Sequence, residues 1–228
     1  MKPELRRFGI SQSPVVIIDD FSGDCEAVAR LADALAPFPS VATGYYPGVR
    51  RMISRADFEA DAYVERTCRE AAQFIAGAFD AQGFDLVEAS FSIVSAQPSE
   101  LQPAQRAPHF DSTDQKYYAL LHFLRVPEGT GTAFYRQRLT GIERVTDENV
   151  DIFVAAARGA ESRLPKDAGY IVHSNETYEQ IGAIEAVPDR LLIYQGSLLH
   201  SGIIPNGMTL SDDPREGRLT ANLFVRGH

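Results

Sequence analysis

The stretch QPAQRAPHFDSTDQKYYALLHFLR, residues 102–125, decides the fold and contains the first candidate site residues. Its opening residues include two prolines and cannot form a regular helix or strand, whereas YYALLHFL is an apolar run typical of a buried strand. His109 and Asp111 lie between them, where a loop enters the strand and functional side chains often occur. In an extended segment, residues two apart point to the same side. The imidazole and the carboxylate can therefore bind the same ion, although an isolated His-x-Asp is more often a solvated surface turn.

Five further runs with strand character surround this stretch and are separated by turn residues. They are DLVEASFSIVSA from residue 85, GTAFYRQR from 131, YEQIGAIEAV from 178, RLLIYQG from 190 and RLTANLFV from 218. Many short strands with turns between them favour a closed antiparallel arrangement such as a jelly roll. Residues 146–163 interrupt these runs and are predicted to form a helical insert.

The first part of the chain, residues 1–84, is predicted to be mainly helical. Asp24 is the expected N-cap of a helix that starts at Cys25, and Ser54 is the expected N-cap of a second, longer helix. Helices followed by strands make the chain α+β in texture. No linker separates two halves, so residues 1–228 are predicted to form a single domain with a jelly-roll core over 85–228.

Composition narrows the class of protein. Of the 228 residues, 44% are hydrophobic and 23% are charged, which is ordinary for a soluble globular protein. The net charge is −9 and no basic stripe is present, so nucleic acid is not an expected partner. No stretch is apolar enough for a secretion signal or a membrane span, which predicts a cytoplasmic protein without membrane contact. The two cysteines are expected to be reduced, buried thiols.

A third candidate ligand lies in PDRLLIYQGSLLHSG, residues 188–202. A turn leads into an apolar strand, a glycine interrupts it, and His200 follows in a short apolar run. By itself, His200 is equally well explained as a core histidine that donates to a backbone carbonyl. Together with His109 and Asp111 it completes a group of two histidines and one carboxylate. Such a facial triad binds Fe(II) and leaves the other coordination positions open.

The last strand-like run begins with an arginine that needs a partner. Alternation places Arg218, Thr220 and Asn222 on one face of the strand. A guanidinium beside a buried site is costly unless an anion pairs with it. A carboxylate ligand held by the guanidinium, with a hydroxyl alongside, removes this cost. The alternative is an exposed arginine that pairs with a nearby acid such as Glu216.

In this order the motifs resemble those of the Fe(II)/2-oxoglutarate-dependent oxygenases, with the prolyl-hydroxylase-like branch as the most similar. The resemblance covers roughly residues 86–226, and the order of the motifs is more specific than any one of them. The motifs are HFD at 109, YALLHFL from 118, GTAF from 131, PDRLLIY from 188, the histidine at 200 and RLT from 218.

This resemblance implies a double-stranded β-helix core (jelly-roll, cupin-like) with His109, Asp111 and His200 as catalytic iron ligands. It implies that Arg218, assisted by Thr220, holds the distal carboxylate of 2-oxoglutarate. The family reaction uses dioxygen, oxidises a prime substrate, here a small molecule or a peptide or protein, and releases succinate and CO2. Related halogenases lack the carboxylate ligand, so Asp111 favours a hydroxylase type of oxidation.

Two assignments are less direct. The family's tyrosine that assists cosubstrate binding has three candidate counterparts, of which we select Tyr118 over Tyr135 and Gln97. For the unidentified prime substrate we select Tyr46 and Arg50, because they lie in the turn-rich segment 45–51, which combines aromatic rings with arginines and is expected to line the substrate entrance. The alternative for that segment is a loop that packs on the barrel with solvated arginines.

Two other function classes stay open at this point. One is a metal-dependent enzyme on a cupin-like barrel that needs no 2-oxoglutarate, which explains the triad but leaves Arg218 without a task. The other is a non-catalytic binding module on the same barrel, against which the intact triad argues. The loop 203–216 and the insert 146–163 are each either active-site lids or surface decoration.

Overall fold

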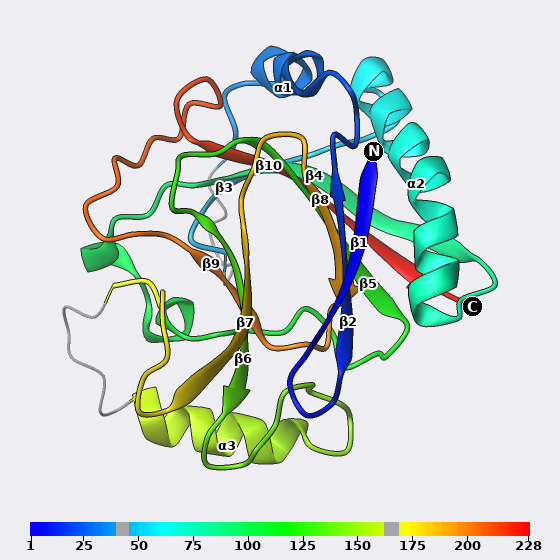
Figure 1. The fold of residues 1–228 in the computed structure, drawn as a ribbon. Coiled ribbons are helices and arrows are strands. Elements are labelled where there is room, and N and C mark those ends of the chain that lie inside the picture. Colours follow the sequence, from blue (N-terminus) through cyan, green and yellow to red (C-terminus); the bar gives the residue numbers. More distant parts are fainter. Residues whose placement is uncertain (40–45, 162–168) are drawn as a thin grey trace.

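Two antiparallel β-sheets lie against each other and form the centre of the structure (Figure 1). The computed structural model describes residues 1–39, 46–161 and 169–228. The large sheet has the strand order β1-β2-β8-β5-β10-β4-β3, and the small sheet has the order β7-β6-β9. The strands are β1 (Lys2–Phe8), β2 (Ser13–Asp19), β3 (Gly48–Met52), β4 (Phe84–Val94), β5 (Tyr117–Arg125), β6 (Gly131–Gln137), β7 (Tyr178–Glu185), β8 (Leu191–Gln195), β9 (His200–Ile203) and β10 (Arg218–Gly227).

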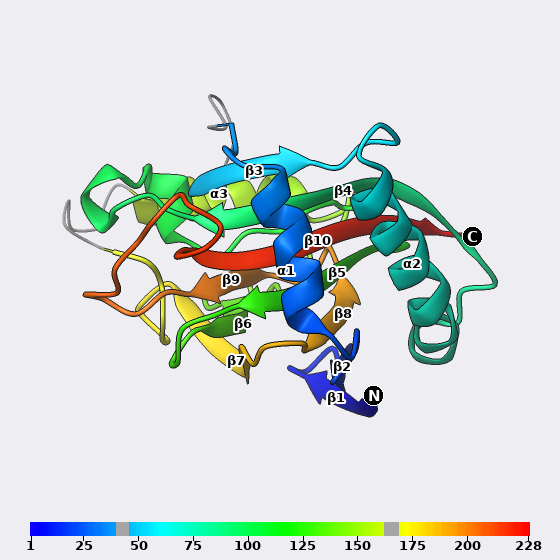
Figure 2. The ribbon, with the colours of Figure 1, turned by 90° about the horizontal axis from the view of Figure 1, so that it is seen from above.

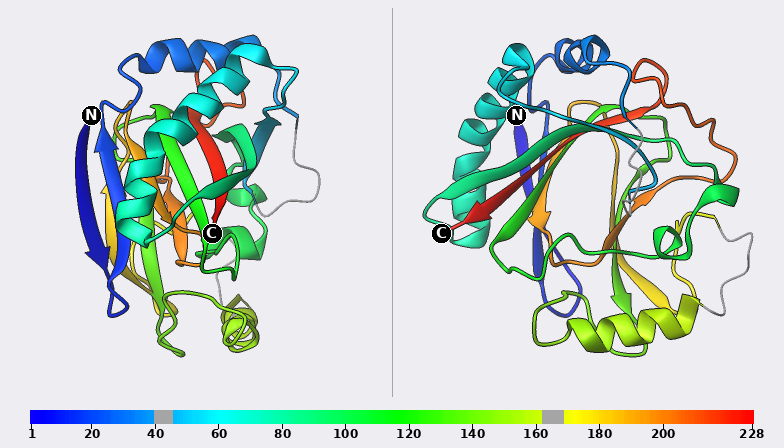
Figure 3. Two further views of the ribbon diagram at one scale, coloured as in Figure 1. Left: turned by 90° about the vertical axis from the view of Figure 1, so that its right-hand side faces the viewer. Right: turned by 180° about the vertical axis from the view of Figure 1, so that it is seen from behind.

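The described residues form three α-helices, which lie on the outside of the sheets (Figures 1 and 2). They are α1 (Cys25–Ala34), α2 (Phe58–Phe79) and α3 (Val150–Glu161). Helices α1 and α2 cover one face of the large sheet (Figure 3), whereas α3 lies at the end of the small sheet. None of these helices is long and apolar enough to cross a lipid bilayer. The prediction of an α+β protein made mainly of short antiparallel strands is therefore confirmed.

Because side chains alternate along its strands, the two faces of the large sheet pack against different parts of the structure. On β5, Leu120 and Leu124 pack under α1 and α2, whereas Ala119 and Phe123 point toward the small sheet. The second set meets side chains of the small sheet such as Phe134 in a separate apolar cluster. The large sheet thus buries one face under the helices and turns the other toward the space between the sheets, where the candidate site lies.

The N-terminal part departs from the mainly helical prediction, because it contributes three strands as well as two helices. Strand β2 is buried and pairs with β8, β1 adds to it at one edge of the large sheet, and β3 pairs with β4 at the other edge. The two expected helices do form. Asp24 caps α1 by accepting from the Ala27 N–H at 2.9 Å, but α2 begins at Phe58, later than a cap at Ser54 implies. The reason is that Ser54 donates its N–H to Asp57 at 2.8 Å and closes a turn before the helix.

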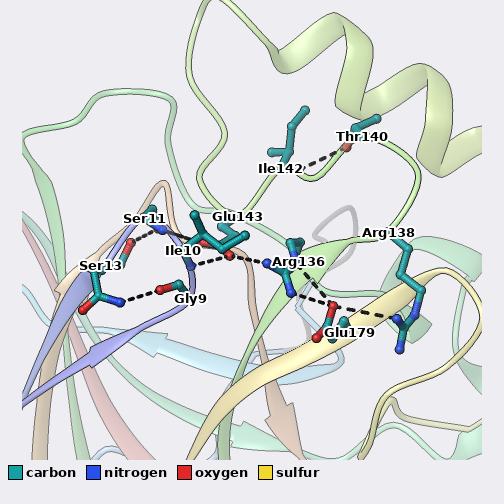
Figure 4. A network of polar contacts seen from close by, with 11 residues as sticks. Gly9, Ile10, Ser11, Ser13, Arg136, Arg138, Thr140, Ile142, Glu143 and Glu179 are labelled. Carbon is teal, nitrogen blue, oxygen red and sulfur yellow. Dashed lines mark hydrogen bonds and ion pairs between the residues drawn. The ribbon is translucent and has the colours of Figure 1, made fainter.

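A buried carboxylate ties the β1–β2 turn to the small sheet (Figure 4). Glu143 accepts from the backbone N–H groups of Ile10 and Ser11 at 3.0 and 2.9 Å, and from the Ser11 hydroxyl at 2.6 Å. Arg136 on β6 donates to Glu143 at 3.3 Å and to Glu179 on β7 at 2.7 Å. This network holds the edge hairpin in place, so it supports the wall of the space between the sheets without entering the candidate site.

A second buried network lies on the helix-covered side of the large sheet. His122 on β5 is fully buried, with one ring nitrogen 2.8 Å from the Tyr63 hydroxyl of α2 and the other 3.0 Å from an Asp189 oxygen. Cys25 lies beside them and its thiol donates to the Leu124 carbonyl oxygen at 3.3 Å. His122 is therefore a core residue with both ring nitrogens in hydrogen bonds. The predicted insert 146–163 contains α3, and its last two residues lie outside the described part of the chain.

Candidate active site

His109 and His200 lie side by side although they are far apart in the sequence. The backbone N–H of each donates to the carbonyl oxygen of the other at 2.9 Å, which forms an isolated antiparallel bridge. Their ring centroids are 4.3 Å apart. His200 begins β9 of the small sheet, and His109 lies on the segment that leads into β5 of the large sheet. The bridge therefore fixes both imidazoles where the two sheets meet.

Asp111 completes this group. One of its carboxylate oxygens lies 3.8 Å from His109 Nε2, and the other lies 3.6 Å from His200 Nε2. One ligand atom from each residue lies within 4.8 Å of the other two, which is close enough for a single ion to contact all three. The three residues that the sequence singles out as candidate ligands are thus brought together.

Gly196, which directly follows β8, makes room for this carboxylate. The Asp111 N–H donates to the Gly196 carbonyl oxygen at 2.7 Å. A Cβ atom at Gly196 would lie 3.2 Å from Asp111 Cβ and 2.8 Å from the Tyr117 ring. Any side chain there would push on the aspartate or the ring, so the glycine break in RLLIYQG serves the site as well as the turn.

The hydrogen bonds and burial leave lone pairs for a cation. His200 Nδ1 lies 2.7 Å from the Leu198 carbonyl oxygen and must donate to it, which leaves Nε2 without a proton. Burial lowers the pKa of His200 to about 4, so the ring is neutral at pH 7. Burial raises the pKa of Asp111 to about 6, and Asp111 Oδ2 has no hydrogen-bond partner among the described residues. A buried oxygen without a partner is costly, and a bound cation would satisfy it.

Solvent reaches this group from one side. The His109 side chain is 51% exposed, whereas those of His200 and Asp111 are 6% and 15% exposed. A ligand can therefore approach past His109 without the structure opening.

Arg218 is a buried guanidinium with few partners. It begins β10 and is 5% exposed. Its Nη2 donates to the Gly131 carbonyl oxygen at 3.1 Å and its guanidinium carbon lies 5.5 Å from the centroid of the Phe123 ring. Its Nε has no hydrogen-bond partner among the described residues, and burial lowers the pKa of Arg218. Pairing with Glu216 does not occur, because the Glu216 carboxylate instead accepts from Ser211 at 3.4 Å.

One cavity of about 340 Å³ contains both the triad and Arg218. Thr220, on the same face of β10 as Arg218, also lines it, and its hydroxyl lies 3.4 Å from the Ser92 carbonyl oxygen. Tyr194 of β8 also lines the cavity, and its ring centroid lies 4.9 Å from that of His200. Burial raises the pKa of its hydroxyl, the charge of Asp111 adds to this effect and that of Arg218 opposes it. The cavity therefore joins a candidate cation site to a guanidinium that forms no ion pair with any described residue.

Tyr46 and Arg50, which the sequence places at the substrate entrance, line the same cavity. The Arg50 guanidinium carbon lies 5.8 Å from the centroid of the Tyr46 ring. Burial raises the pKa of Tyr46 to about 12, an effect that the charges of Arg218 and Arg50 oppose. Tyr46 therefore lies beside Arg50 in the cavity that Arg218 also lines. Tyr45, the first residue of the predicted segment, lies outside the described residues.

Tyr118 does not line the cavity, so its predicted contact with the cosubstrate is wrong. Its ring packs on Phe79 of α2 with the centroids 4.7 Å apart, on the helix-covered face of β5. Because side chains alternate along a strand, the neighbouring Ala119 lines the cavity instead. The other two sequence candidates do not line the cavity either. The Tyr135 hydroxyl donates to the Ile171 carbonyl oxygen at 3.4 Å, and Gln97 is the N-cap of the short 3-10 helix Pro98–Glu100.

Sequence reasoning missed three features of the cavity, namely Tyr194, Gly196 and Asn222 as lining or shaping residues. For Tyr194 and Gly196 a signal exists, because they directly precede the run that carries His200. Asn222 shares the strand parity of Arg218 and Thr220, and that parity is enough to place it at the cavity.

Comparison with known families settles where the chain belongs. A family model described as a family of unknown function, DUF6445, matches residues 1–225. The chain belongs to the DUF6445 family. The match runs from β1 through most of β10, so the DUF6445 family region includes the three N-terminal strands as well as the candidate site. A search of curated proteins finds no match to this DUF6445 chain.

Solved structures share the fold of the DUF6445 chain. The non-haem alpha-ketoglutarate-dependent epimerase SnoN from nogalamycin biosynthesis matches with a TM-score of 0.56 and 14% identity, over 95% of this chain and 80% of SnoN. The carbocyclase SnoK of the same biosynthesis matches with a TM-score of 0.56 and 11% identity, over 95% and 81%. Iron-bound HygX from Streptomyces hygroscopicus matches with a TM-score of 0.52 and 13% identity, over 96% and 84%. The predicted resemblance to the Fe(II)/2-oxoglutarate-dependent oxygenases is therefore confirmed at the level of the fold.

Proposed function

We propose that this chain is a non-haem Fe(II)- and 2-oxoglutarate-dependent dioxygenase of the hydroxylase type. One observation carries the proposal: a single cavity contains a buried carboxylate oxygen and a buried guanidinium nitrogen, neither of which has a hydrogen-bond partner in the part of the chain that the structure describes. A cation would satisfy the first and an anion the second. A metal ion chelated by a dicarboxylate with a keto group supplies both at once.

The donor set fits ferrous iron. His109 and His200 offer imidazole nitrogens and Asp111 offers a carboxylate oxygen, which is the facial set that leaves positions for other ligands. When bound, iron would supply the activation of dioxygen that oxidises the prime substrate while 2-oxoglutarate becomes succinate and CO2. The protein holds the ligands in place. The backbone bridge to His109 fixes the position of His200, and the hydrogen bond from Nδ1 to the Leu198 carbonyl oxygen fixes the ring in the tautomer that can bind a metal.

Arg218 fits the distal carboxylate of 2-oxoglutarate, with Thr220 alongside. Among the described residues the guanidinium makes a single hydrogen bond, to Gly131, and so has donors left for a bidentate contact. In place of Tyr118 we assign the assisting tyrosine to Tyr194 or Tyr46, because both line the cavity together with Arg218.

The architecture and the neighbours support the same proposal. We interpret the two opposed sheets as a double-stranded β-helix and the described chain as one domain, with the candidate ligands where the sheets meet. HygX, which shares the fold, has been solved with iron bound and with nickel, 2-oxoglutarate and hygromycin B bound. The prime substrate enters past His109, where Tyr46 and Arg50 line the cavity.

An anaerobic titration tests the function. Metal-free protein is loaded with Fe(II), because zinc and nickel compete for such sites, and 2-oxoglutarate is then added. We expect the visible charge-transfer absorption of an iron-chelated 2-oxo acid. Iron binding without this band indicates a metal enzyme that needs no 2-oxoglutarate. Absence of iron binding indicates a non-catalytic module and overturns the proposal.

A further inference from the structure

Beyond the groups assigned to iron and 2-oxoglutarate, a second guanidinium lines the cavity, and a carboxylate that is not part of the cavity lining pairs with it. Arg50 of β3 donates from Nη2 to Glu88 Oε1 at 2.9 Å and to the Ser90 hydroxyl at 2.9 Å. Its Nε is buried and has no hydrogen-bond partner among the described residues. Asn222, which faces Ser90 across the β4–β10 pair, has a buried Oδ1 that also lacks a partner. A donor on β3 and an acceptor on β10, on either side of β4, are thus left for a ligand.

This second set lies on the Asp111 side of the cavity rather than at the Arg218 end. Ser90, to which Arg50 donates, pairs with Asn222, four residues along β10 from Arg218. Glu88 pairs with Phe224, whose ring stacks on Tyr117, and the Gly196 position adjoins both the Tyr117 ring and Asp111. With one carboxylate of 2-oxoglutarate at Arg218 and the other on the metal, the Arg50 set is free for the prime substrate.

The pair of opposite charges selects the kind of substrate. A purely anionic group at Arg50 would be repelled by Glu88, and a purely cationic group at Glu88 would be repelled by Arg50. A ligand that carries both charges on neighbouring atoms satisfies both. The Arg50 side chain is 22% exposed and that of Glu88 is 36% exposed, so the carboxylate lies nearer to solvent.

Size and the apolar wall narrow the choice further. The cavity volume of about 340 Å³ is near the lower end of the range for ligand pockets, about 300–1,000 Å³, and 2-oxoglutarate must share it. Phe224, which stacks on Tyr117 with the centroids 5.4 Å apart, gives the cavity an apolar side near Glu88. A peptide carries its ammonium and carboxylate groups at opposite ends, whereas a free amino acid carries them on one carbon.

We propose that the prime substrate is a free α-amino acid whose carboxylate binds Arg50 and whose ammonium group binds Glu88, an inference that rests on the proposed oxygenase function. Asn222 Oδ1 accepts a further hydrogen from the ammonium group, and the side chain lies toward Phe224. In this pose the charged end is fixed beside Asp111 and the side chain is presented to the proposed metal.

The test uses the whole chain loaded with manganese and 2-oxoglutarate, to which the twenty L-amino acids are added one at a time in a calorimeter. The tightest binder is then compared with its methyl ester, which lacks the anion, and its N-acetyl form, which lacks the cation. We expect each modification to weaken binding roughly tenfold or more, as the loss of one charge-assisted contact implies. These ligand comparisons use the unaltered protein, so they do not depend on the folding of any variant.

Variants assign each effect to a residue. Arg50→Gln should bring the acid and its methyl ester to similar affinities, and Glu88→Gln should do the same for the free and N-acetyl amines. The matched control is Arg51→Ala: this arginine is the next residue on β3, pairs with Asp57 at 2.7 Å and does not line the cavity, so both discriminations should persist.

The outcomes separate this inference from the proposed function. If the 2-oxoglutarate band forms but none of the twenty amino acids binds, or the ester binds as well as the acid, the amino-acid inference is overturned and the oxygenase function stands. If the band does not form, the oxygenase function fails and this inference fails with it.

Discussion

Replacing Arg218 with methionine keeps most of the side-chain volume and removes the charge. Without cosubstrate, the buried guanidinium carries a desolvation penalty of several kcal/mol. Against this stand one hydrogen bond to Gly131, worth about 1.5–3 kcal/mol, and one cation–π contact with Phe123, worth about 0.5–2 kcal/mol. These terms nearly cancel, so Arg218→Met should leave the metal-free, cosubstrate-free protein as stable as the native chain or slightly more stable.

The same change should weaken 2-oxoglutarate binding strongly. Charge-assisted hydrogen bonds contribute about 1.5–3 kcal/mol, which corresponds to a loss of affinity of about 10- to 150-fold. Urea unfolding of the apo protein and titration of 2-oxoglutarate into the metal-loaded protein measure the two quantities separately. Arg125→Met is the control: it removes an arginine paired with Asp33 at 2.7 Å, so it should lower stability without changing cosubstrate affinity. An Arg218→Met protein that unfolds more easily yet binds 2-oxoglutarate normally would refute the reasoning.

Three further predictions concern the supports of the site. Burial alone would raise the pKa of Asp189, but hydrogen bonds from His122 and from the turn before α1 hold it well below its usual range. This carboxylate therefore contributes stability that is complete above about pH 4 and is lost as the pH falls further. In urea unfolding between pH 7 and 3, the free energy of unfolding should fall less steeply with pH for Asp189→Asn than for the native chain. An equally steep fall would count against this role of Asp189. Glu143→Ala leaves two backbone N–H groups of the β1–β2 turn without their acceptor, so the free energy of unfolding should fall by about 2 kcal/mol. The charge-transfer band of iron-chelated 2-oxoglutarate should be retained. A loss of that band would place Glu143 in the site. Gly196→Ala should displace the Asp111 carboxylate and reduce Fe(II) affinity about tenfold or more, and equal iron affinity in an equilibrium titration would contradict this assignment.

Much of the fold is readable from apolar patterning. All six sequence runs that alternate or are continuously apolar form strands, namely β4, β5, β6, β7, β8 and β10. Strand β2 was also readable, because Val15 to Ile18 form an apolar, β-branched run bounded by Pro14 and Asp19. Strand β1 carries no such signal: its side chains are largely exposed, and its place depends on backbone pairing with β2.

The candidate site, like the fold, is predictable from the sequence only where local patterns mark its residues. His109, Asp111, His200 and Arg218 are marked by spacing, by strand entry and by the cost of a buried charge, and the structure gathers all four at one cavity. The choice of Tyr118 failed because the turn between Asp111 and β5 breaks the alternation, so the sequence does not tell which tyrosine faces inward. Only the pairing of β5 with β8 and β10 fixes that parity.

The position of iron in crystals of the loaded protein tests the central claim most directly. Anomalous diffraction measured at the iron edge, with 2-oxoglutarate present and oxygen excluded, should show one strong peak in contact with His109, Asp111 and His200, and density for the cosubstrate that reaches Arg218. The same experiment would also reveal iron at a second possible site. This site is formed by Cys25, His122 and Asp189, whose metal-binding atoms lie within 4.8 Å of one another. Iron at that second site, or a triad without iron, would contradict the account.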